Sequence, residues 1–342
     1  MKKLTLLLLA IFLLACSSEE KIIDNSNKGI YLISASDGEQ PFIARHNIQT
    51  GVLVSDDLYF EANNKSLETK VAKISAFKSM YYILQPELNR LLILNREDRT
   101  EFKTLDFSEK GLQPVDICFP NATDAYLLCK DKVIIIDITV YEPAIEIDLG
   151  TEATMINCIG NQVFTANTSD NSITFLDTRT KGITNKINIS DKPVDIEILP
   201  DGERLGILCA GNGKLEEGNK SSAYFDIVDI ATQSVLEHIP LDVNNRSSVE
   251  LFPKKIVSTP KDWAFIVAKD VFFRIDLKNT ANINFISQID FSDLIYDNVN
   301  QMMILNQKVG ENQCRFYTAD QNNGIIQSQY DYNQAVISFI RE

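Results

Sequence analysis

Short apolar segments separated by polar turns run through nearly the whole chain after residue 28. They are rich in Ile, Val, Tyr and Phe and are bounded by Asn, Asp, Gly or Pro, as at 132–138, 161–167, 172–177 and 271–277. Such segments recur about every 8–12 residues, which is the spacing of an antiparallel all-β domain. No long segment shows the periodicity of an amphipathic helix. We therefore predict an all-β protein.

One kind of strand recurs along the chain, with an Ile or Leu at its centre and often a Pro near its start. Residues 113–118 (QPVDIC) closely match residues 192–197 (KPVDIE), and weaker copies lie at 70–75, 152–157, 252–257, 290–295 and 333–338. These marker strands recur about every 40 residues, with one step of about 60, which is typical of four-stranded propeller blades. Their central residues are Ile74, Ile117, Ile156, Ile196, Ile256, Leu294 and Ile337.

The strands after each marker also follow a common order. A second strand follows a turn, as at 81–85, 125–130, 162–167, 204–210, 263–268 and 302–306. The third strand often ends in an acidic residue, as at Asp137, Asp177, Asp229 and Asp276. We expect each Asp to accept backbone N–H bonds in the turn that follows it. A functional ring of carboxylates is the alternative.

The two ends of the repeat region predict how the ring closes. Residues 30–34 look like a second strand without a marker of its own, and the last marker, 335–340, has no strand after it. We predict a seven-bladed β-propeller over residues 29–342, in which the C-terminal strand is the innermost strand of the N-terminal blade. Such closure removes the open edge that the ring would otherwise expose.

The N-terminus has the pattern of a signal peptide. Lys2 and Lys3 precede an apolar run over 4–14, followed by Ala15 and Cys16. The run is shorter than the ~20 apolar residues that a spanning helix needs. Its ending, LLAC, resembles the lipobox of bacterial lipoproteins; an ordinary secretory signal with a chance Cys is the alternative. The resemblance implies a signal peptide over 1–15, acylation of Cys16 and a lipidated tether over 16–28.

Acidic residues follow the candidate lipidation site. Glu19 and Glu20 look like the surface-export signal of Bacteroidota lipoproteins, although a solvated linker would have the same composition. The resemblance implies an outer-membrane, lipid-anchored protein on the cell surface.

Net charge and cysteine spacing argue against several classes of binding partner and against a metal or redox motif. The net charge of −14 argues against nucleic acid and against adhesion to anionic lipid. Of the 6 cysteines, those after Cys16 show no Cys-x-x-Cys spacing, so a zinc or redox motif is not expected. Their number is odd, so at least one stays unpaired within the chain. Most lie in apolar strands, where a buried free thiol is the ordinary state; they are Cys118, Cys129, Cys158, Cys209 and Cys314.

The Pro-Val-Asp-Ile markers and the Asp-ended third strands resemble those of YncE-like seven-bladed β-propellers over residues 29–342. Together with the lipoprotein-like start, the chain is similar to Bacteroidota surface cobalamin-binding lipoproteins associated with TonB-dependent receptors. This resemblance implies a protein that binds cobalamin or a related corrinoid and passes it to a TonB-dependent transporter. No ligand-contact motif of that group is present, so the implied function rests on architecture and location.

The sequence offers little for catalysis. It has 2 histidines, His46 and His238, which we place on a third strand and an outer fourth strand of different blades. A His-based metal site or a Ser-His-Asp arrangement needs groups that converge, and no phosphate loop or nucleophile motif is present. We predict no enzyme activity, no cofactor and no metal. A propeller-type lyase or hydrolase is one alternative, and a non-catalytic scaffold for envelope proteins is the other.

Ligand-binding residues are expected on one face of the ring. Links into marker strands and turns between second and third strands open on this face, and the long segments 55–69, 211–222 and 243–251 gather there. Their amides and aromatic rings suit a large polar, ring-shaped ligand or the loops of another protein; tolerated surface insertions are the alternative. Trp263, the sole Trp, is expected near the opposite face as a packing residue. The predicted site over the channel mouth comprises Tyr59, Phe60, Asn89, Arg90, Asn167, Asn212, Lys214, Arg246 and Tyr332.

Overall fold

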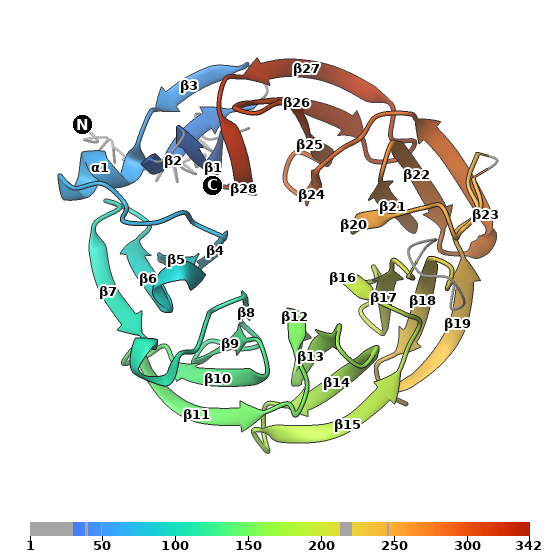
Figure 1. Ribbon diagram of the computed structural model, residues 1–342, viewed down its shortest axis with the longest axis horizontal. Helices are drawn as coiled ribbons and strands as arrows, with labels where there is room; N and C mark the ends of the chain where they lie inside the picture. The colour runs from blue at the N-terminus through green and yellow to red at the C-terminus, as the bar shows by residue number, and fades with distance from the viewer. Residues whose placement is uncertain (1–29, 38–39, 49, 213–220, 245) are drawn as a thin grey trace, which may run out of the picture.

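The computed structural model describes residues 30–37, 40–48, 50–212, 221–244 and 246–342. The predicted signal peptide (1–15), Cys16, the tether (16–28) and Lys214 lie outside these residues. The described chain forms seven antiparallel sheets of four strands each, arranged around a central axis as a β-propeller (Figure 1). This arrangement confirms the predicted fold class and blade number.

We number the blades in chain order and give their strands from the axis outward. Blade 1 comprises β28 (Ala335–Arg341), β1 (Ile30–Asp37), β2 (Gln40–Asn47) and β3 (Val52–Ser55). Blade 2 comprises β4 (Lys73–Phe77), β5 (Met80–Gln85), β6 (Arg90–Asn95) and β7 (Glu101–Asp106), and blade 3 comprises β8 (Asp116–Cys118), β9 (Asp124–Cys129), β10 (Lys132–Asp137) and β11 (Glu142–Asp148).

The remaining four blades follow the same plan. Blade 4 comprises β12 (Ala153–Ile159), β13 (Gln162–Asn167), β14 (Ser172–Asp177) and β15 (Gly182–Asn188), and blade 5 comprises β16 (Pro193–Ile198), β17 (Arg204–Cys209), β18 (Tyr224–Asp229) and β19 (Ser234–Pro240). Blade 6 comprises β20 (Pro253–Thr259), β21 (Trp263–Ala268), β22 (Val271–Asp276) and β23 (Asn279–Ser287), and blade 7 comprises β24 (Asp293–Asp297), β25 (Met302–Gly310), β26 (Gln313–Asp320) and β27 (Ile326–Tyr332).

Every predicted marker strand is the innermost strand of a blade. The predicted central residues of β4, β8, β12, β16, β20 and β24 are buried. The last marker differs, because Ile337 is 39% exposed. The register of β28 against β1 shifts between Ser338 and Val336, so Ile337 is the extra residue of a β-bulge. Phe339, which is 2% exposed, fills the core position in this strand.

The C-terminal strand closes the ring as predicted. β28 pairs with β1 antiparallel, with Tyr31 opposite Arg341. The buried carboxylate of Asp297 in blade 7 accepts a hydrogen bond from the Tyr31 hydroxyl and lies 3.3 Å from the Arg341 guanidinium. Glu342 pairs with Arg45 of blade 1 at 2.5 Å and with Arg99 of blade 2 at 2.8 Å. The closing strand, or latch, is therefore held by contacts from both neighbouring blades, 7 and 2.

Acidic residues at the ends of third strands stabilise the turns that follow them. Asp137 accepts the backbone N–H of Thr139 at 2.8 Å, and Asp177 accepts that of Arg179 at 2.7 Å. Asp229 and Asp276 make the same kind of bond. The structure therefore confirms the turn-stabilising interpretation of these residues.

Apolar residues from adjacent blades form seven buried clusters, one in each joint between blades. In the joint between blades 4 and 5, for example, Phe164 and Phe175 meet edge to face with ring centroids 5.5 Å apart. The core is thus distributed around the ring, and each sheet buries both faces against its neighbours. All five cysteines of the described residues are free thiols, and Cys158 alone is only half-buried.

Three short helices interrupt the β architecture of the described residues: α1 (Leu58–Asn63), η2 (Pro86–Leu88) and η3 (Ser108–Lys110). The sequence pattern did not predict α1, which lies inside the long 55–69 segment. The Asp57 side chain begins this helix by accepting the backbone N–H groups of Tyr59 and Phe60, each at 3.1 Å. Among the described residues, no helix is long and apolar enough to span a membrane.

Candidate ligand-binding sites

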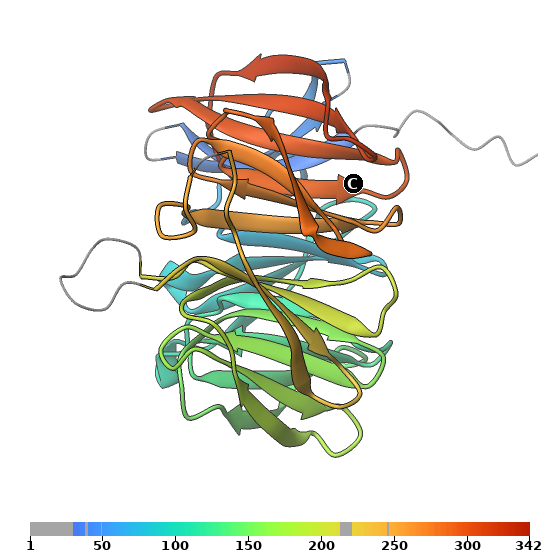
Figure 2. The same ribbon diagram turned by 90° about the vertical axis from the view of Figure 1, so that its right-hand side faces the viewer.

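The antiparallel blades give the ring two different faces. The face on which the innermost strands begin carries the links between blades and the turns between second and third strands, and we call it the loop face. The opposite face carries the beginning of β1 at Ile30 and the end of β28 at Arg341, which are close in register, and we call it the terminal face. Figure 2 shows the ring edge-on, with the C-terminus labelled. Both ends of the described chain therefore leave the ring from the face opposite the long loops.

Two of the predicted ligand residues lie on α1 in the link between blades 1 and 2. Tyr59 is buried, and its hydroxyl donates a hydrogen bond to Glu101. Burial and this carboxylate raise the pKa of Tyr59, so its hydroxyl stays protonated. Phe60, in contrast, is 47% exposed. Only Phe60 of this pair offers its ring to solvent.

Three further predicted residues are held by contacts within the chain. Arg90 donates to Gln85 at 2.7 Å and pairs with Glu68 at 3.2 Å. Asn89 ends η2 in the left-handed conformation, with φ of 52°. Asn167 is fully buried, and its amide donates to Ser172 at 2.7 Å. These contacts give Arg90 and Asn167 structural roles.

The three other predicted residues that the structure describes lie at different joints between blades. Arg246 donates to the backbone carbonyl of Lys269 at 3.0 Å, near the joint between blades 5 and 6. Asn212 is exposed at the turn between β17 and β18, and Tyr332 is buried at the end of β27. Lys214 lies outside the described residues. The structure thus does not bring the eight described residues to one pocket, although Asn212 and Tyr332 each line a hollow.

The hollow at Asn212 is a groove of about 650 Å³ between blades 4 and 5, beside the mouth of the central channel. Six of its eight lining residues carry a hydroxyl, amide or ammonium group. The backbone N–H of Lys192 donates to Asn171 at 2.8 Å, which fixes the link between the two blades in place. The groove is lined by Thr154, Thr168, Ser169, Asn171, Lys192, Pro193, Val194 and Asn212.

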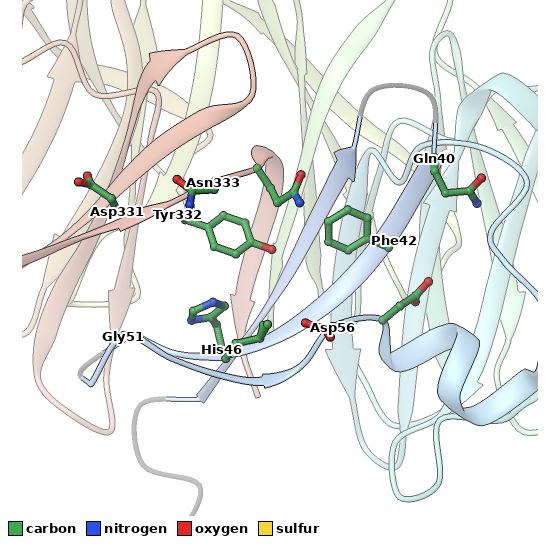
Figure 3. A pocket seen from close by; sticks show the side chains of 11 residues that line it. Gln40, Phe42, His46, Gly51, Asp56, Asp331, Tyr332 and Asn333 are labelled. Atoms are coloured by element: carbon green, nitrogen blue, oxygen red, sulfur yellow. The ribbon is translucent and has the colours of Figure 1, made fainter.

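The hollow at Tyr332 is a cavity of about 560 Å³ at the closure joint, where β27 of blade 7 faces β2 and β3 of blade 1. Figure 3 shows the rings of Phe42, His46 and Tyr332 directed into the same space, with Asp56 and Asp331 at its edge (Figure 3). His46 stacks on Tyr330 with centroids 5.7 Å apart and meets Tyr332 edge-on at 5.0 Å. The remaining lining residues are Gln40, Gly51, Leu53, Asp57, Asn333 and Gln334.

His46 is chemically unusual in this cavity. It is 5% exposed, and burial lowers its pKa, so the imidazole is neutral at neutral pH. Its Nδ1 atom has no hydrogen-bond partner within the described residues, and neither has Oε1 of the neighbouring Gln334. Buried polar atoms are normally satisfied by protein or by a bound molecule. The sequence suggested only a structural role for His46, because its position on a third strand gave no sign of the aromatic and acidic neighbours.

The central channel forms a third hollow, of about 470 Å³. In several blades, the residue directly before the central Ile of the innermost strand places a charged side chain in this channel. Lys73 pairs with Asp116 of the next blade, and Lys255 pairs with Asp195 of the preceding blade at 3.1 Å. The alternation of Lys and Asp at one marker position is visible in the sequence, although the pairing is not.

These carboxylates also stabilise the unpaired inner edges of the blades. An innermost strand has no neighbour on its channel side, so some of its N–H groups need other acceptors. Asp195 accepts the N–H of Ile256 at 2.9 Å, and Glu197 accepts that of Ser258 at 2.7 Å. Burial raises the pKa of Glu197 to about 7. The channel charges are therefore satisfied within the protein, which favours a structural role.

No group of three or more His, Cys, Asp or Glu residues in the described part of the chain is arranged to hold a metal ion. His238 lies on the outer strand β19 and is 2.8 Å from Asp226, far from His46 in the chain and on a different blade.

Comparison with solved structures identifies similar folds. The chain is similar to a structure described as Kuenenia stuttgartiensis hydrazine synthase, with 16% identity and a TM-score of 0.59 over 74% of this chain and 78% of that one. It is also similar to the Neurospora crassa Pan2 WD40 domain, with 10% identity and a TM-score of 0.60 over 80% of this chain and 85% of that one. No protein-family model and no curated protein sequence matches the chain. At these identities the likeness shows the β-propeller fold alone.

Proposed function

We propose that this chain is a lipid-anchored, non-catalytic binding propeller of the outer membrane, and that it captures a corrinoid for a TonB-dependent transporter. The observation that supports this proposal most is the position of the chain ends. The described chain begins and ends on the terminal face, so an anchor at Cys16 would leave the loop face directed away from the membrane. A ligand arriving from outside would then meet the loop face first.

The groove between blades 4 and 5 is the proposed corrinoid site. Its volume of about 650 Å³ lies within the usual ~300–1,000 Å³ of ligand sites, and it opens beside the channel mouth. Its hydroxyl and amide groups suit the peripheral carboxamides of a corrinoid, which both donate and accept hydrogen bonds. Asn171 reaches it from blade 4 and Asn212 from blade 5, so a bound molecule would bridge the two blades.

Calorimetry of the domain 29–342 with cobalamin tests this assignment. We expect measurable binding, weakened about tenfold to a hundredfold in a Thr154→Val/Asn212→Ala variant, because each lost contact to a desolvated group costs about 1–3 kcal/mol. Asn188→Ala, on the exposed outer strand of blade 4, is the matched control. Absence of heat with the wild type would reject a corrinoid as the ligand.

The anchor is tested separately. Cys16→Ser should release the protein from membrane fractions or leave an unprocessed precursor, because the acylated thiol is lost. Protease treatment of intact cells should remove the wild-type propeller if it is displayed on the surface. Protection from protease, with lipidation intact, would place the protein on the inner side of the membrane.

A protein-docking scaffold is the second candidate, and β3 is the observation that favours it. This strand is the outer edge of blade 1, and Val52, Leu53 and Val54 are 56%, 44% and 43% exposed. An apolar edge strand is a template for pairing with another chain. Co-purification of a TonB-dependent receptor should fall in a Val52→Ser/Val54→Ser variant and persist in the control Ile183→Ser, which changes an exposed apolar residue on the outer strand of blade 4. Equal recovery with both variants would exclude β3 as the contact.

A further inference from the structure

The cavity at the closure joint has an unbalanced set of charges. Asp56, Asp57 and Asp331 contribute three carboxylates to its lining, which contains no Lys or Arg. Asp331 is neutralised by Arg315, whose guanidinium bonds both of its oxygens at 2.5 and 3.1 Å. Asp57 is occupied by the first N–H groups of α1. Asp56 is exposed, and it pairs with no cation within the described residues.

Aromatic rings form the other side of the same cavity. Phe42 and His46 lie on β2 of blade 1, and Tyr332 lies on β27 of the adjacent blade 7. The His46 ring meets the Tyr332 ring edge-on across the joint. A cation is attracted to the face of an aromatic ring, and the attraction grows where water is excluded. Rings and carboxylates in one hollow therefore favour a positively charged group on an apolar body.

The unpartnered buried atoms provide an independent observation. Nδ1 of His46 and Oε1 of Gln334 both belong to residues that line the cavity, and neither atom has a partner in the part of the chain that the structure describes. The amide oxygen is an acceptor, and a neutral imidazole has one acceptor nitrogen. A ligand N–H would satisfy either atom, whereas an anion would meet three carboxylates.

We propose that this cavity is a binding site for an organic cation, a primary ammonium or guanidinium group carried on an aromatic or aliphatic body. Its volume of about 560 Å³ accommodates a small molecule or a single basic side chain of a peptide. The site lies between blades 7 and 1, apart from the groove between blades 4 and 5, and so goes beyond the proposed corrinoid function. A negative result with cobalamin leaves it unaffected.

The two histidines allow a direct test, because each gives its own ring ¹⁵N signals and His238 serves as an internal reference on blade 5. Benzylamine, N-acetyl-lysine methylamide, N-acetyl-arginine methylamide and neutral benzyl alcohol are titrated into the domain 29–342. We expect the amines to shift the His46 signals saturably and to leave His238 unchanged. Benzylamine should bind at least about tenfold more tightly than benzyl alcohol. Stronger binding of the amino-acid probes would indicate a peptide source, and stronger binding of benzylamine a free amine.

Matched variants then locate the contact. Asp56→Asn should weaken benzylamine about threefold to tenfold, because it removes the carboxylate without a cation. Asp131→Asn, an exposed carboxylate on the same face at the turn after β9, is the control and should bind as the wild type does. His46→Phe keeps the stacked ring and removes the nitrogens, and it too should weaken benzylamine.

Three results would overturn the proposal. They are equal affinity for benzylamine and benzyl alcohol, equal shifts at His46 and His238, and equal weakening by Asp56→Asn and Asp131→Asn. The wild-type titration decides the question even if the His46→Phe variant does not fold.

Discussion

The joint between blades 4 and 5 and the closure joint between blades 7 and 1 solve the same packing problem differently. In the first, consecutive parts of the chain meet, and large rings such as Phe164 and Phe175 are completely buried. In the second, opposite ends of the chain meet, a bulge interrupts β28, and a cavity of about 560 Å³ remains. Unpartnered buried atoms of His46, Asn306, Tyr330 and Gln334 belong to the closure joint.

The two joints leave different kinds of space. The groove between blades 4 and 5 lies at the surface, outside the buried apolar cluster, whereas the closure cavity is lined by residues with unpartnered buried polar atoms. Every buried polar atom left without a partner costs about 1–3 kcal/mol. A joint that keeps both a cavity and unsatisfied atoms is therefore less stable than its neighbours, unless something binds there. The following predictions test whether the closure joint contributes differently to the stability of the ring than the other joints do.

The largest effect is expected from removal of the latch. Deleting residues 334–342 removes β28, including buried Phe339, and leaves the inner edge of β1 unpaired. Loss of one buried Phe side chain alone costs about 3–5 kcal/mol, so the total should exceed ~5 kcal/mol. The melting temperature should fall by more than about 10 °C relative to the domain 29–342. A truncated chain that melts like the complete domain would show that the latch does not hold the ring.

Two buried aspartates allow a matched comparison of the joints. Asp297 at the closure joint contacts Tyr31 and Arg341 of blade 1, whereas Asp177 in blade 4 bonds only its own turn and Arg179, which is 71% exposed. Asp297→Ala should cost about 2–4 kcal/mol, because it leaves the buried Tyr31 hydroxyl without its acceptor and the partly exposed Arg341 without its carboxylate. Asp177→Ala should lower the melting temperature by no more than about 3 °C. Equal effects in thermal unfolding would contradict the special role of the closure joint.

At the joint between blades 5 and 6, where Glu197 meets Ser258, we expect the free energy of unfolding to depend on pH. Burial raises the pKa of Glu197 to about 7 from an ordinary value of 4.5, so the folded state favours the protonated carboxyl. Its contribution to stability is complete below about pH 4.5 and is lost as the pH rises through 7. Glu197→Gln keeps an acceptor for Ser258 without the titration. The variant should therefore gain about 1–2 kcal/mol relative to wild type between pH 5 and pH 8.

Urea unfolding at the two pH values measures this gain. Glu109→Gln, which changes an exposed residue of η3, is the control. A constant difference between Glu197→Gln and wild type across the pH range would mean that Glu197 is already ionised in the folded protein at pH 5.

The smallest effect is expected far from the closure joint, at the sole Trp. The Arg274 guanidinium lies 3.8 Å from the centroid of the Trp263 ring at the terminal-face end of blade 6. Arg274→Met should cost about 1 kcal/mol, because the cation–π contact is partly exposed. Fluorescence of the single Trp should change while the melting temperature shifts by only about 2–4 °C. An unchanged emission spectrum would show that the stacking does not persist in solution.

The sequence predicted the blade plan well because the repeat is local. Each marker strand needs only a buried centre such as Ile117 or Ile196, and each turn needs only an Asp, so a window of a few residues contains the signal. The prediction of a buried central residue was wrong for Ile337, which lies in β28. The partner of this strand, β1, is about 300 residues away in the chain. The register of β28 depends on β1, and a bulge there cannot be read from the local pattern.

The candidate sites were less predictable for a related reason. Asn167 was expected to face a ligand, yet three neighbouring polar side chains of its own blade satisfy it. Conversely, His46 seemed unremarkable because its aromatic partners, Tyr330 and Tyr332, come from the far end of the chain. Sites assembled from distant segments become visible only when the ring is closed.

The pairing of the first strand with the last has a consequence for how the protein is made. A ribosome synthesises β1 about 300 residues before β28, so the inner edge of β1 has no partner strand until β28 emerges. Blades 2 to 6 can form as their sequences appear, whereas blade 1 remains one strand short throughout synthesis. During that time its exposed edge is able to pair with another nascent chain, which makes the N-terminal blade the segment most in need of a chaperone.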